Sequence, residues 1–193
     1  MIETYSNASY NESFRYVIVV EYSAKFMHKI WVIFAICILM PGCISTDSTL
    51  EEPEFTPFPT FNLVDEQNQS QNNSMYGDTP FVAYFSASWC SHCKPTLQAL
   101  DDTIPEGHLL VFNKDHREQH SNMTEWKEEM ESGLNRTLEH PFIHAPSLAS
   151  SLNVTGIPTM FFVNNNGQII HFEQGLKNET TIQHYWEQIK LDE

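Results

Sequence analysis

The chain has 193 residues, of which 41% are hydrophobic, so it can form one domain with its own core plus terminal appendages. Its 25 acidic residues outnumber its 10 lysines and arginines, and the formal charge of −15 argues against nucleic acid as a partner, because phosphate binding needs clustered cations. The acidity favours solubility, or else the steering of a positively charged partner.

An unbroken apolar run over residues 30–40 is the first marked feature along the chain. It is shorter than the roughly 20 residues that span a bilayer, but it suits the core of a secretory signal, which runs about 7–15 residues. A basic flank precedes the run and acidic residues precede that flank, so Met27 is the better start for a signal. Residues 1–42 are therefore predicted to be a targeting segment.

The apolar run ends at Pro41-Gly42-Cys43, which resembles a lipoprotein cleavage box with Cys43 as the residue to be lipidated. An uncleaved short anchor is the alternative, and either one places the rest of the chain outside the cytoplasm, anchored to the cell membrane. Residues 43–60 are rich in Ser, Thr, Pro and Glu and are predicted to be a tether. The domain is expected over residues 61–193.

The first half of this domain alternates between strand and helix patterns. The predicted elements are strands over residues 61–64, 81–86 and 108–112 and a helix over residues 90–103. The apolar residues at 81–86 run without alternation, which is typical of a strand buried on both faces. In the helix, Leu97 and Leu100 are expected to face inward.

Two cysteines, Cys90 and Cys93, lie at the junction between this strand and the helix. Such a pair can close a small disulfide and open it again. The thiolate of Cys90 is favoured, because the helix dipole and free backbone N–H groups stabilise negative charge at a helix start. A zinc site would need further soft ligands, and no other cysteine follows. The spacing therefore predicts a redox site.

Residues 116–152 form a long connection with an amphipathic helix inside it. Its apolar stripe consists of Met123, Trp126, Met130 and Leu134. A short helix is expected over residues 146–152. Strands over 159–163 and 168–172 then flank Asn164-Asn165-Asn166-Gly167, which predicts a β-hairpin. A final helix is expected over residues 179–190, with Asn178 as its cap.

Two motifs carry a resemblance to a known family. The segment Trp89-Cys90-Ser91-His92-Cys93-Lys94 resembles the active-site motif of the thioredoxin superfamily, closest to that of protein disulfide isomerase domains. Gly156-Ile157-Pro158-Thr159 is similar to the cis-proline loop of the same superfamily. The resemblance covers roughly residues 60–192 and implies an α/β thioredoxin fold. This fold has a central mixed sheet flanked by helices, here with a longer helical connection before the cis-proline loop.

The resemblance also implies roles for the site residues. Cys90 would attack a partner disulfide, and Cys93 would resolve the mixed disulfide by attacking the Cys90 sulfur. Pro158 would lie against Cys90 and leave the backbone before it free for an extended substrate segment, and Trp89 would shield one side of the pair. His92 would stabilise the thiolate and make the disulfide more oxidising.

The overall layout resembles membrane-anchored thiol–disulfide oxidoreductase lipoproteins, which implies exported cysteine-containing proteins and a redox partner protein as partners. The protein is expected to be a monomer and to need no cofactor. The net direction stays open between a reductant and an oxidase or isomerase. One departure from the family is Tyr84, which stands where thioredoxin has a buried aspartate and is a poor base at neutral pH.

Two other functions remain open from the sequence. A copper chaperone would use Cys90 and Cys93 with a histidine or methionine, because thiolates favour Cu(I). A redox-inert adhesion domain would use neither thiol. Two histidine pairs have a spacing of four residues, namely His116 with His120 and His140 with His144. The first pair lies in a polar stretch and Pro141 interrupts the second, so no metal site is predicted there.

Overall fold

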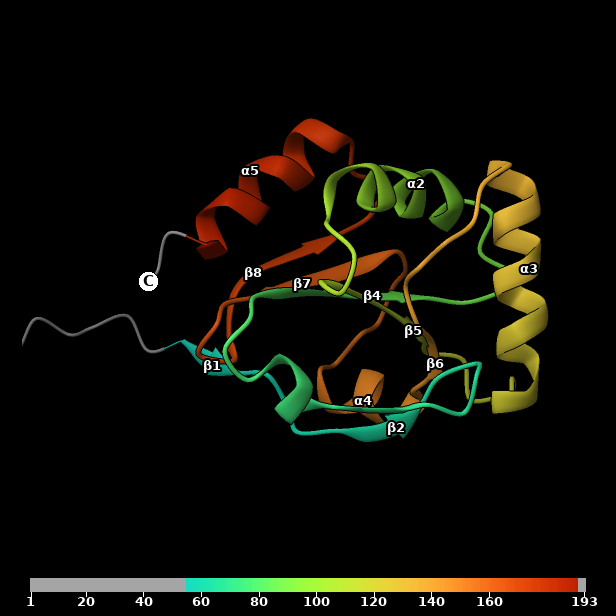
Figure 1. Cartoon of the computed structure of the whole chain (residues 1–193), viewed down its shortest axis with the longest axis horizontal. Coiled ribbons are helices and arrows are strands. Elements are labelled where there is room, and N and C mark those ends of the chain that lie inside the picture. Colours follow the sequence, from blue (N-terminus) through green and yellow to red (C-terminus); the bar gives the residue numbers. More distant parts are fainter. Residues whose placement is uncertain (1–54, 191–193) are drawn as a thin grey trace, which may run out of the picture. The chain divides into compact units, whose positions relative to one another are not determined.

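The computed structural model describes residues 55–190 of the chain (Figure 1). The expectations placed on Met27, on the apolar run over residues 30–40 and on Cys43 lie outside these residues. Among the helices that the structure does describe, none combines the length and the apolar character needed to cross a bilayer.

A six-stranded mixed sheet forms the centre of residues 55–190, in the order β1-β8-β7-β4-β5-β6. Its strands are β1 (Thr56–Pro57), β4 (Phe81–Ser86), β5 (Leu109–Asn113), β6 (Phe142–His144), β7 (Thr159–Val163) and β8 (Gln168–Gln174). The strands β4, β5 and β6 run parallel, whereas β7 is antiparallel to both β4 and β8. The central strands β4, β5 and β7 are buried throughout, as their continuous apolar runs predict.

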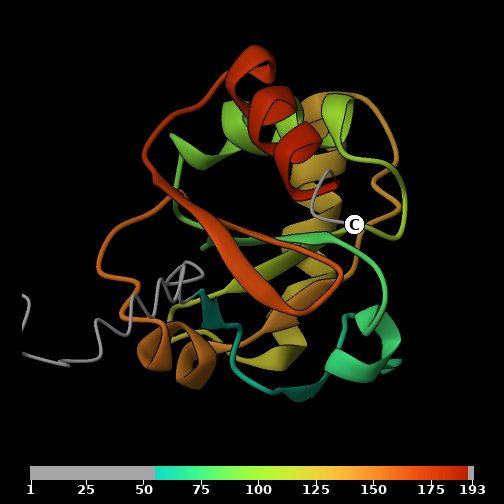
Figure 2. The ribbon, with the colours of Figure 1, turned by 90° about the vertical axis from the view of Figure 1, so that its left-hand side faces the viewer.

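Helices cover both faces of this sheet (Figures 1 and 2). One core cluster joins the sheet to α2 (Cys93–Thr103), α3 (Met123–Leu134) and α5 (Glu179–Lys190). A second cluster on the other face contains α4 (Pro146–Ser151) together with Phe58 and Phe61. The mixed sheet flanked by helices, with α3 and β6 in the connection before β7, is the architecture that the resemblance implies.

Most of the predicted elements are present. Strand β4 and helix α5 have the predicted bounds, and the Asn178 side chain caps α5 by accepting the Thr181 N–H at 3.0 Å. In the hairpin, Phe161 pairs with Phe172, and the turn is closed by Gly167 at a φ of 73°. That left-handed conformation is one that glycine adopts without steric cost.

The predicted helix over residues 90–103 begins later than expected, at Cys93. The reason is a turn within the cysteine motif, in which the Cys93 N–H donates to the Cys90 carbonyl at 3.0 Å. Cys90 therefore lies just before the helix rather than in its first turn. Strand β6 was not predicted, because three residues are too few for a periodic pattern.

The segment before β4 packs on the sheet and protects one of its edges. Strand β1 pairs with β8, so the packed domain already includes residues 56 and 57, upstream of the boundary expected at 61. A small hairpin of β2 (Asn62–Val64) and β3 (Ser70–Asn72) follows. In its loop, Glu66 accepts the Phe142 N–H of β6 at 2.8 Å and pairs with Lys127 at 2.6 Å. These contacts occupy the outer edge of β6. Two short 3-10 helices, η1 (Asn73–Tyr76) and η2 (His120–Asn122), complete the fold.

Candidate active site

Cys90 and Cys93 lie at the carboxyl end of strand β4, joined by a disulfide. The strand ends at Ser86, and the chain then turns so that the Cys90 N–H donates to the Ala87 carbonyl at 3.1 Å. The Cα atoms of the two cysteines are 5.3 Å apart. Helix α2 starts at Cys93, so its N-terminus, which favours negative charge, adjoins both sulfur atoms.

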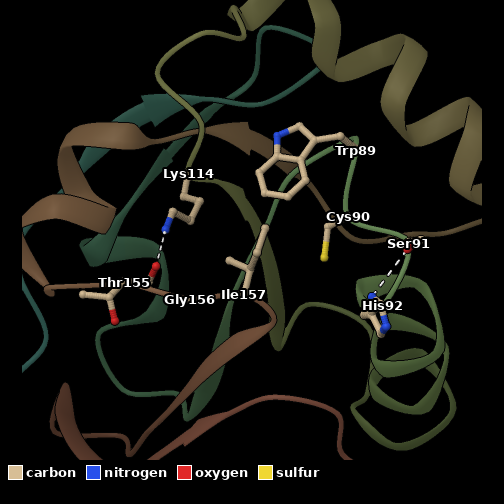
Figure 3. A pocket seen from close by; sticks show the side chains of 8 residues that line it. All are labelled: Trp89, Cys90, Ser91, His92, Lys114, Thr155, Gly156 and Ile157. Atoms are coloured by element: carbon tan, nitrogen blue, oxygen red, sulfur yellow. Dashed lines mark hydrogen bonds between the residues drawn. The ribbon is translucent and has the colours of Figure 1, made fainter.

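The two cysteines differ in their access to solvent. Cys93 is only 1% exposed and belongs to the core, whereas Cys90 is half-buried and lines a pocket of about 440 Å³. The other residues of the pocket are Trp89, Ser91, His92, Lys114, Thr155, Gly156 and Ile157 (Figure 3). A partner molecule therefore reaches the Cys90 sulfur before that of Cys93.

The Ile157–Pro158 peptide bond is cis, and the loop that contains it reaches the same pocket. Because β7 is antiparallel to β4, the start of β7 lies beside the end of β4, with Thr159 opposite Phe85. The Pro158 ring is buried, and its carbonyl accepts the Gly175 N–H of the neighbouring segment at 2.8 Å. The topology thus brings two motifs that are far apart in the sequence to one place.

Lys114, directly after strand β5, fixes this loop from the other side. Its Nζ donates to the carbonyls of Val154 at 2.8 Å and Thr155 at 3.3 Å, while its backbone N–H donates to the Ser86 carbonyl at 3.0 Å. Sequence reasoning missed this residue. The available signal was its position after a buried strand parallel to β4, since the carboxyl ends of parallel strands share one edge.

The indole of Trp89 is held at the rim of the pocket by Asp115. Its Nε1–H donates to the Asp115 carboxylate at 2.6 Å, although the side chain as a whole is 59% exposed. Arg117 donates from Nε and Nη2 to the same carboxylate and lies 5.9 Å from the centre of the indole ring. The Arg117 and Trp89 donors hold the pKa of Asp115 well below its usual range, despite the burial of the carboxyl group.

We expect Asp115→Asn to destabilise the fold by about 1–2 kcal/mol at neutral pH, because it weakens the charged hydrogen bonds to Asp115. The effect stays this small because the Arg117 side chain is largely exposed, so solvent screens its charge. The Asp115 pKa is lower in the folded than in the unfolded chain, so its stabilisation is present above the ordinary value of 3.8 and is lost as the pH falls below it. Urea unfolding of both proteins should show that the difference in their free energies of unfolding narrows below about pH 4. A difference that stays constant from neutral pH to about pH 2 would contradict the lowered pKa of Asp115.

Tyr84 supports the active-site helix from beneath. Its hydroxyl donates to the Cys93 carbonyl at 2.8 Å, and the side chain is fully buried. Burial raises the pKa of the Tyr84 phenol further above its ordinary value of 10.0. The phenol therefore stays neutral and acts as a hydrogen-bond donor, not as the base that would take the proton of Cys93.

Tyr84→Phe is expected to cost about 1 kcal/mol of stability through the lost hydrogen bond. The dependence of the exchange rate on pH should keep its shape between about pH 6 and 9, because the phenol does not titrate in this range. Urea unfolding and stopped-flow exchange with a small disulfide measure the two effects. A displaced pH profile with unchanged stability would mean that the phenol takes part in proton transfer.

His92 and the second pair of histidines, His140 and His144, lie in different surroundings. His92 is exposed and occupies the N-cap position of α2, with its Nδ1 3.5 Å from the Ser91 hydroxyl. His140 is buried against Asp101 at 3.1 Å, and His144 contacts the Asp115 carbonyl at 3.2 Å. Within residues 55–190, no three His, Cys, Asp or Glu side chains gather as a group that could hold a metal ion.

Comparisons with known proteins agree with this geometry. The thioredoxin-like domain family matches residues 67–190, which is more than half of the chain. A comparison with curated proteins found no match. Among solved structures, the exposed lipoprotein thioredoxin Etrx1 of Streptococcus pneumoniae has a TM-score of 0.56 at 20% identity, over 67% of this chain and 99% of its own.

Two further structures are similar to the same degree. A thiol:disulfide interchange protein of the thioredoxin family from Chlorobium tepidum has a TM-score of 0.56 at 19% identity, covering 70% of this chain and 96% of its own. A thio-disulfide isomerase from Thermus thermophilus has a TM-score of 0.55 at 20% identity, covering 70% and 95%. At these identities the likeness establishes the fold.

Proposed function

Because the chain belongs to the thioredoxin-like family, we propose that it is a thiol–disulfide oxidoreductase that exchanges disulfides with exported proteins through Cys90 and Cys93. The observation that carries this proposal is the unequal burial of the two sulfur atoms. Cys90 opens to a pocket and Cys93 is closed in the core, yet the two are close enough to form a disulfide. An attacking thiol and a resolving thiol need this arrangement.

In the reducing direction, the Cys90 thiolate attacks one sulfur of a partner disulfide. The partner S–S bond breaks, a mixed disulfide forms, and the second partner sulfur leaves as a thiolate that takes a proton from water. Cys93 then loses its proton and attacks the Cys90 sulfur, which releases the first partner sulfur. Two electrons have passed to the partner, and Cys90 and Cys93 are oxidised. The oxidising direction is the reverse of these steps.

The loop before Pro158 supports binding of an extended partner segment. Among residues 55–190, the backbone N–H and C=O of Ile157 have no hydrogen-bond partner, and its side chain lines the pocket next to Cys90. A partner strand can therefore pair with this backbone while its cysteine reaches Cys90. Trp89 stands exposed at the rim, where it offers an apolar surface to the same segment.

We place this activity outside the cytoplasm, on a membrane tether. The apolar run over residues 30–40 and the cleavage box ending at Cys43 support this placement. The likeness to the pneumococcal lipoprotein thioredoxin is consistent with it. A monomer that acts on exported cysteine-containing proteins, and that exchanges electrons with a separate redox protein, fits all these features.

Insulin reduction tests the proposal directly. With dithiothreitol as the electron source, the protein should accelerate the precipitation of insulin chains, and a Cys90→Ser, Cys93→Ser double variant should not exceed the rate with dithiothreitol alone. Titration of the reduced protein with Cu(I) is the second arm. Tight copper binding by both thiols without any acceleration of insulin reduction would favour the copper chaperone and overturn the proposal.

A further inference from the structure

The pocket beside Cys90 lacks negative charge in a domain that is rich in it. Residues 55–190 contain seven lysines and arginines against sixteen aspartates and glutamates. The pocket is nevertheless lined by Lys114 and His92 and by no carboxylate. Figure 3 shows these two side chains on opposite sides of Cys90. The pocket that holds Cys90 is thus lined by a cation, Lys114, although the domain as a whole carries a negative charge.

Lys114 also differs from the other cations of the domain. Five of the seven lysines and arginines pair with carboxylates at 2.5–2.8 Å, namely Arg117, Lys127, Arg136, Lys177 and Lys190. Only Lys94 and Lys114 have no carboxylate partner within residues 55–190. The Lys94 side chain lies over Gly133 of α3, so Lys114 alone brings an unpaired cation into the pocket.

The acidic residues that follow Lys114 are occupied elsewhere. Asp115 is taken up by Arg117 and by the Trp89 indole. The Glu118 carboxylate accepts the Ser88 N–H at 3.3 Å and the Asn113 side-chain amide at 3.0 Å. Neither carboxylate lines the pocket or pairs with the lysine, although both lie on the same loop.

An ammonium group has three N–H donors. Lys114 uses two of them, in its hydrogen bonds to the Val154 and Thr155 carbonyls. Neutral carbonyls leave the full positive charge of the lysine uncompensated and one N–H free. We propose that Lys114 determines specificity by selecting disulfide partners that carry a carboxylate beside the reacting cysteine. The carboxylate accepts the free N–H while the partner sulfur reaches Cys90. This inference rests on the exchange activity proposed above.

The contrast with the rest of the domain strengthens the selection. The net negative charge of the domain disfavours a carboxylate-bearing partner in general, whereas the unpaired lysine attracts it at the pocket, so the attraction also orients the partner. The same carboxylate chemistry is present on an acidic peptide segment and on a small anionic disulfide. Both sources are therefore compared in the experiment.

The test measures the rate at which the reduced protein is oxidised by matched disulfides. The peptide arm uses two oxidised homodimers that differ only in having Glu or Gln next to the cysteine. The small-molecule arm compares dithiodipropionate, which is anionic, with hydroxyethyl disulfide, which is neutral. Each rate is divided by the rate of dithiothreitol with the same disulfide, because a carboxylate also changes intrinsic reactivity. We expect a normalised preference of about two- to fivefold for the carboxylate, the range of an exposed ion pair.

Lys114→Gln keeps a donor for the two carbonyls but removes the charge, so its normalised preference should fall to about one. Lys94→Gln is the matched control, because it removes a charge that lies near the redox pair but outside the pocket. Its preference for the carboxylate-bearing disulfide should equal that of the parent protein. The preference should also shrink at high salt. A role of Lys114 in holding the loop alone would slow both members of each pair equally and leave the ratio unchanged.

The outcomes separate the inference from the proposed function. If only the peptide arm shows a preference for the carboxylate, the partner selected by Lys114 is a protein segment. If only the small-molecule arm shows it, the partner is a small anionic disulfide. A ratio of one in the parent protein, or an unchanged ratio in Lys114→Gln, overturns the inference while the exchange activity stands. No exchange with any of the four disulfides overturns the proposed function and the inference together.

Discussion

Replacing Cys93 with serine should trap the protein on its partners as mixed disulfides. Cys90 lines the pocket and Cys93 is buried behind it, so a partner disulfide reacts at Cys90 first. Without Cys93, residues 55–190 hold no second thiolate that can break the bond between Cys90 and the partner sulfur. We expect covalent adducts that persist on non-reducing gels and turnover of insulin that falls to the background rate. Mass spectrometry of the adducts from whole-cell extracts identifies the partners.

Cys90→Ser is the matched control for this experiment. It keeps one thiol of the pair, but that thiol is enclosed by the core and should form no adduct. Equal adduct yields from the two variants would contradict the assignment of Cys90 as the attacking residue. So would adducts with Cys90→Ser alone, since they would reverse the two roles.

Leu97→Ala should destabilise the domain by about 2–5 kcal/mol, the usual cost of a cavity at a fully buried leucine. Leu97 is 0% exposed and lies about one turn after Cys93 on α2, where it belongs to the same core cluster as Tyr84 and Trp126. Because this packing holds the helix that begins at Cys93, we also expect slower exchange. Urea unfolding followed by circular dichroism measures the first effect.

The neighbouring Gln98 provides the control, since it lies on the exposed side of the same helix. Gln98→Ala should change the free energy of unfolding by less than about 0.5 kcal/mol. If Leu97→Ala were as mild as this control, the side chain could not be an anchor of α2, and the packing of the helix on the sheet would have to be reconsidered.

The parts of the fold that sequence reasoning predicted are those with a local signal. Strand β4 was visible as a continuous apolar run, and α5 as an apolar stripe that begins after a capping asparagine. The turn of the last hairpin was visible in the Asn-Gly pair before β8. In each case the residues that determine the structure are neighbours along the chain.

The features that were missed depend on residues far apart in the sequence. Strand β6 has three residues, and its outer edge is satisfied by Glu66, which lies 76 positions before Phe142. The Lys114 ammonium fixes a carbonyl that is 40 positions away. No periodic pattern or motif marks such a contact, because Glu66 and Lys114 each look like an ordinary surface charge in the sequence.

For the candidate site, the sequence pointed to the two motifs but not to the contacts that hold their side chains. Trp89 was expected to shield the cysteine pair, but its contact with Asp115 could not be foreseen from the motif. Likewise, Tyr84 was recognised as a poor base, whereas its hydrogen bond to the Cys93 carbonyl emerges only from the packing of α2 on β4. The roles of Cys90, Cys93, His92 and Pro158 in exchange remain predictions.

The contact of the Glu66 carboxylate with the outer edge of strand β6 has a consequence for self-association. An uncovered border of a sheet is a template on which a second copy can add its own strand, and repeated addition yields polymers. The Phe142 N–H, which such a copy would need as a donor, already donates to the Glu66 carboxylate. The ion pair with Lys127 keeps the Glu66 side chain in place. Copies of the domain at high concentration are thereby kept from pairing strand to strand along this edge.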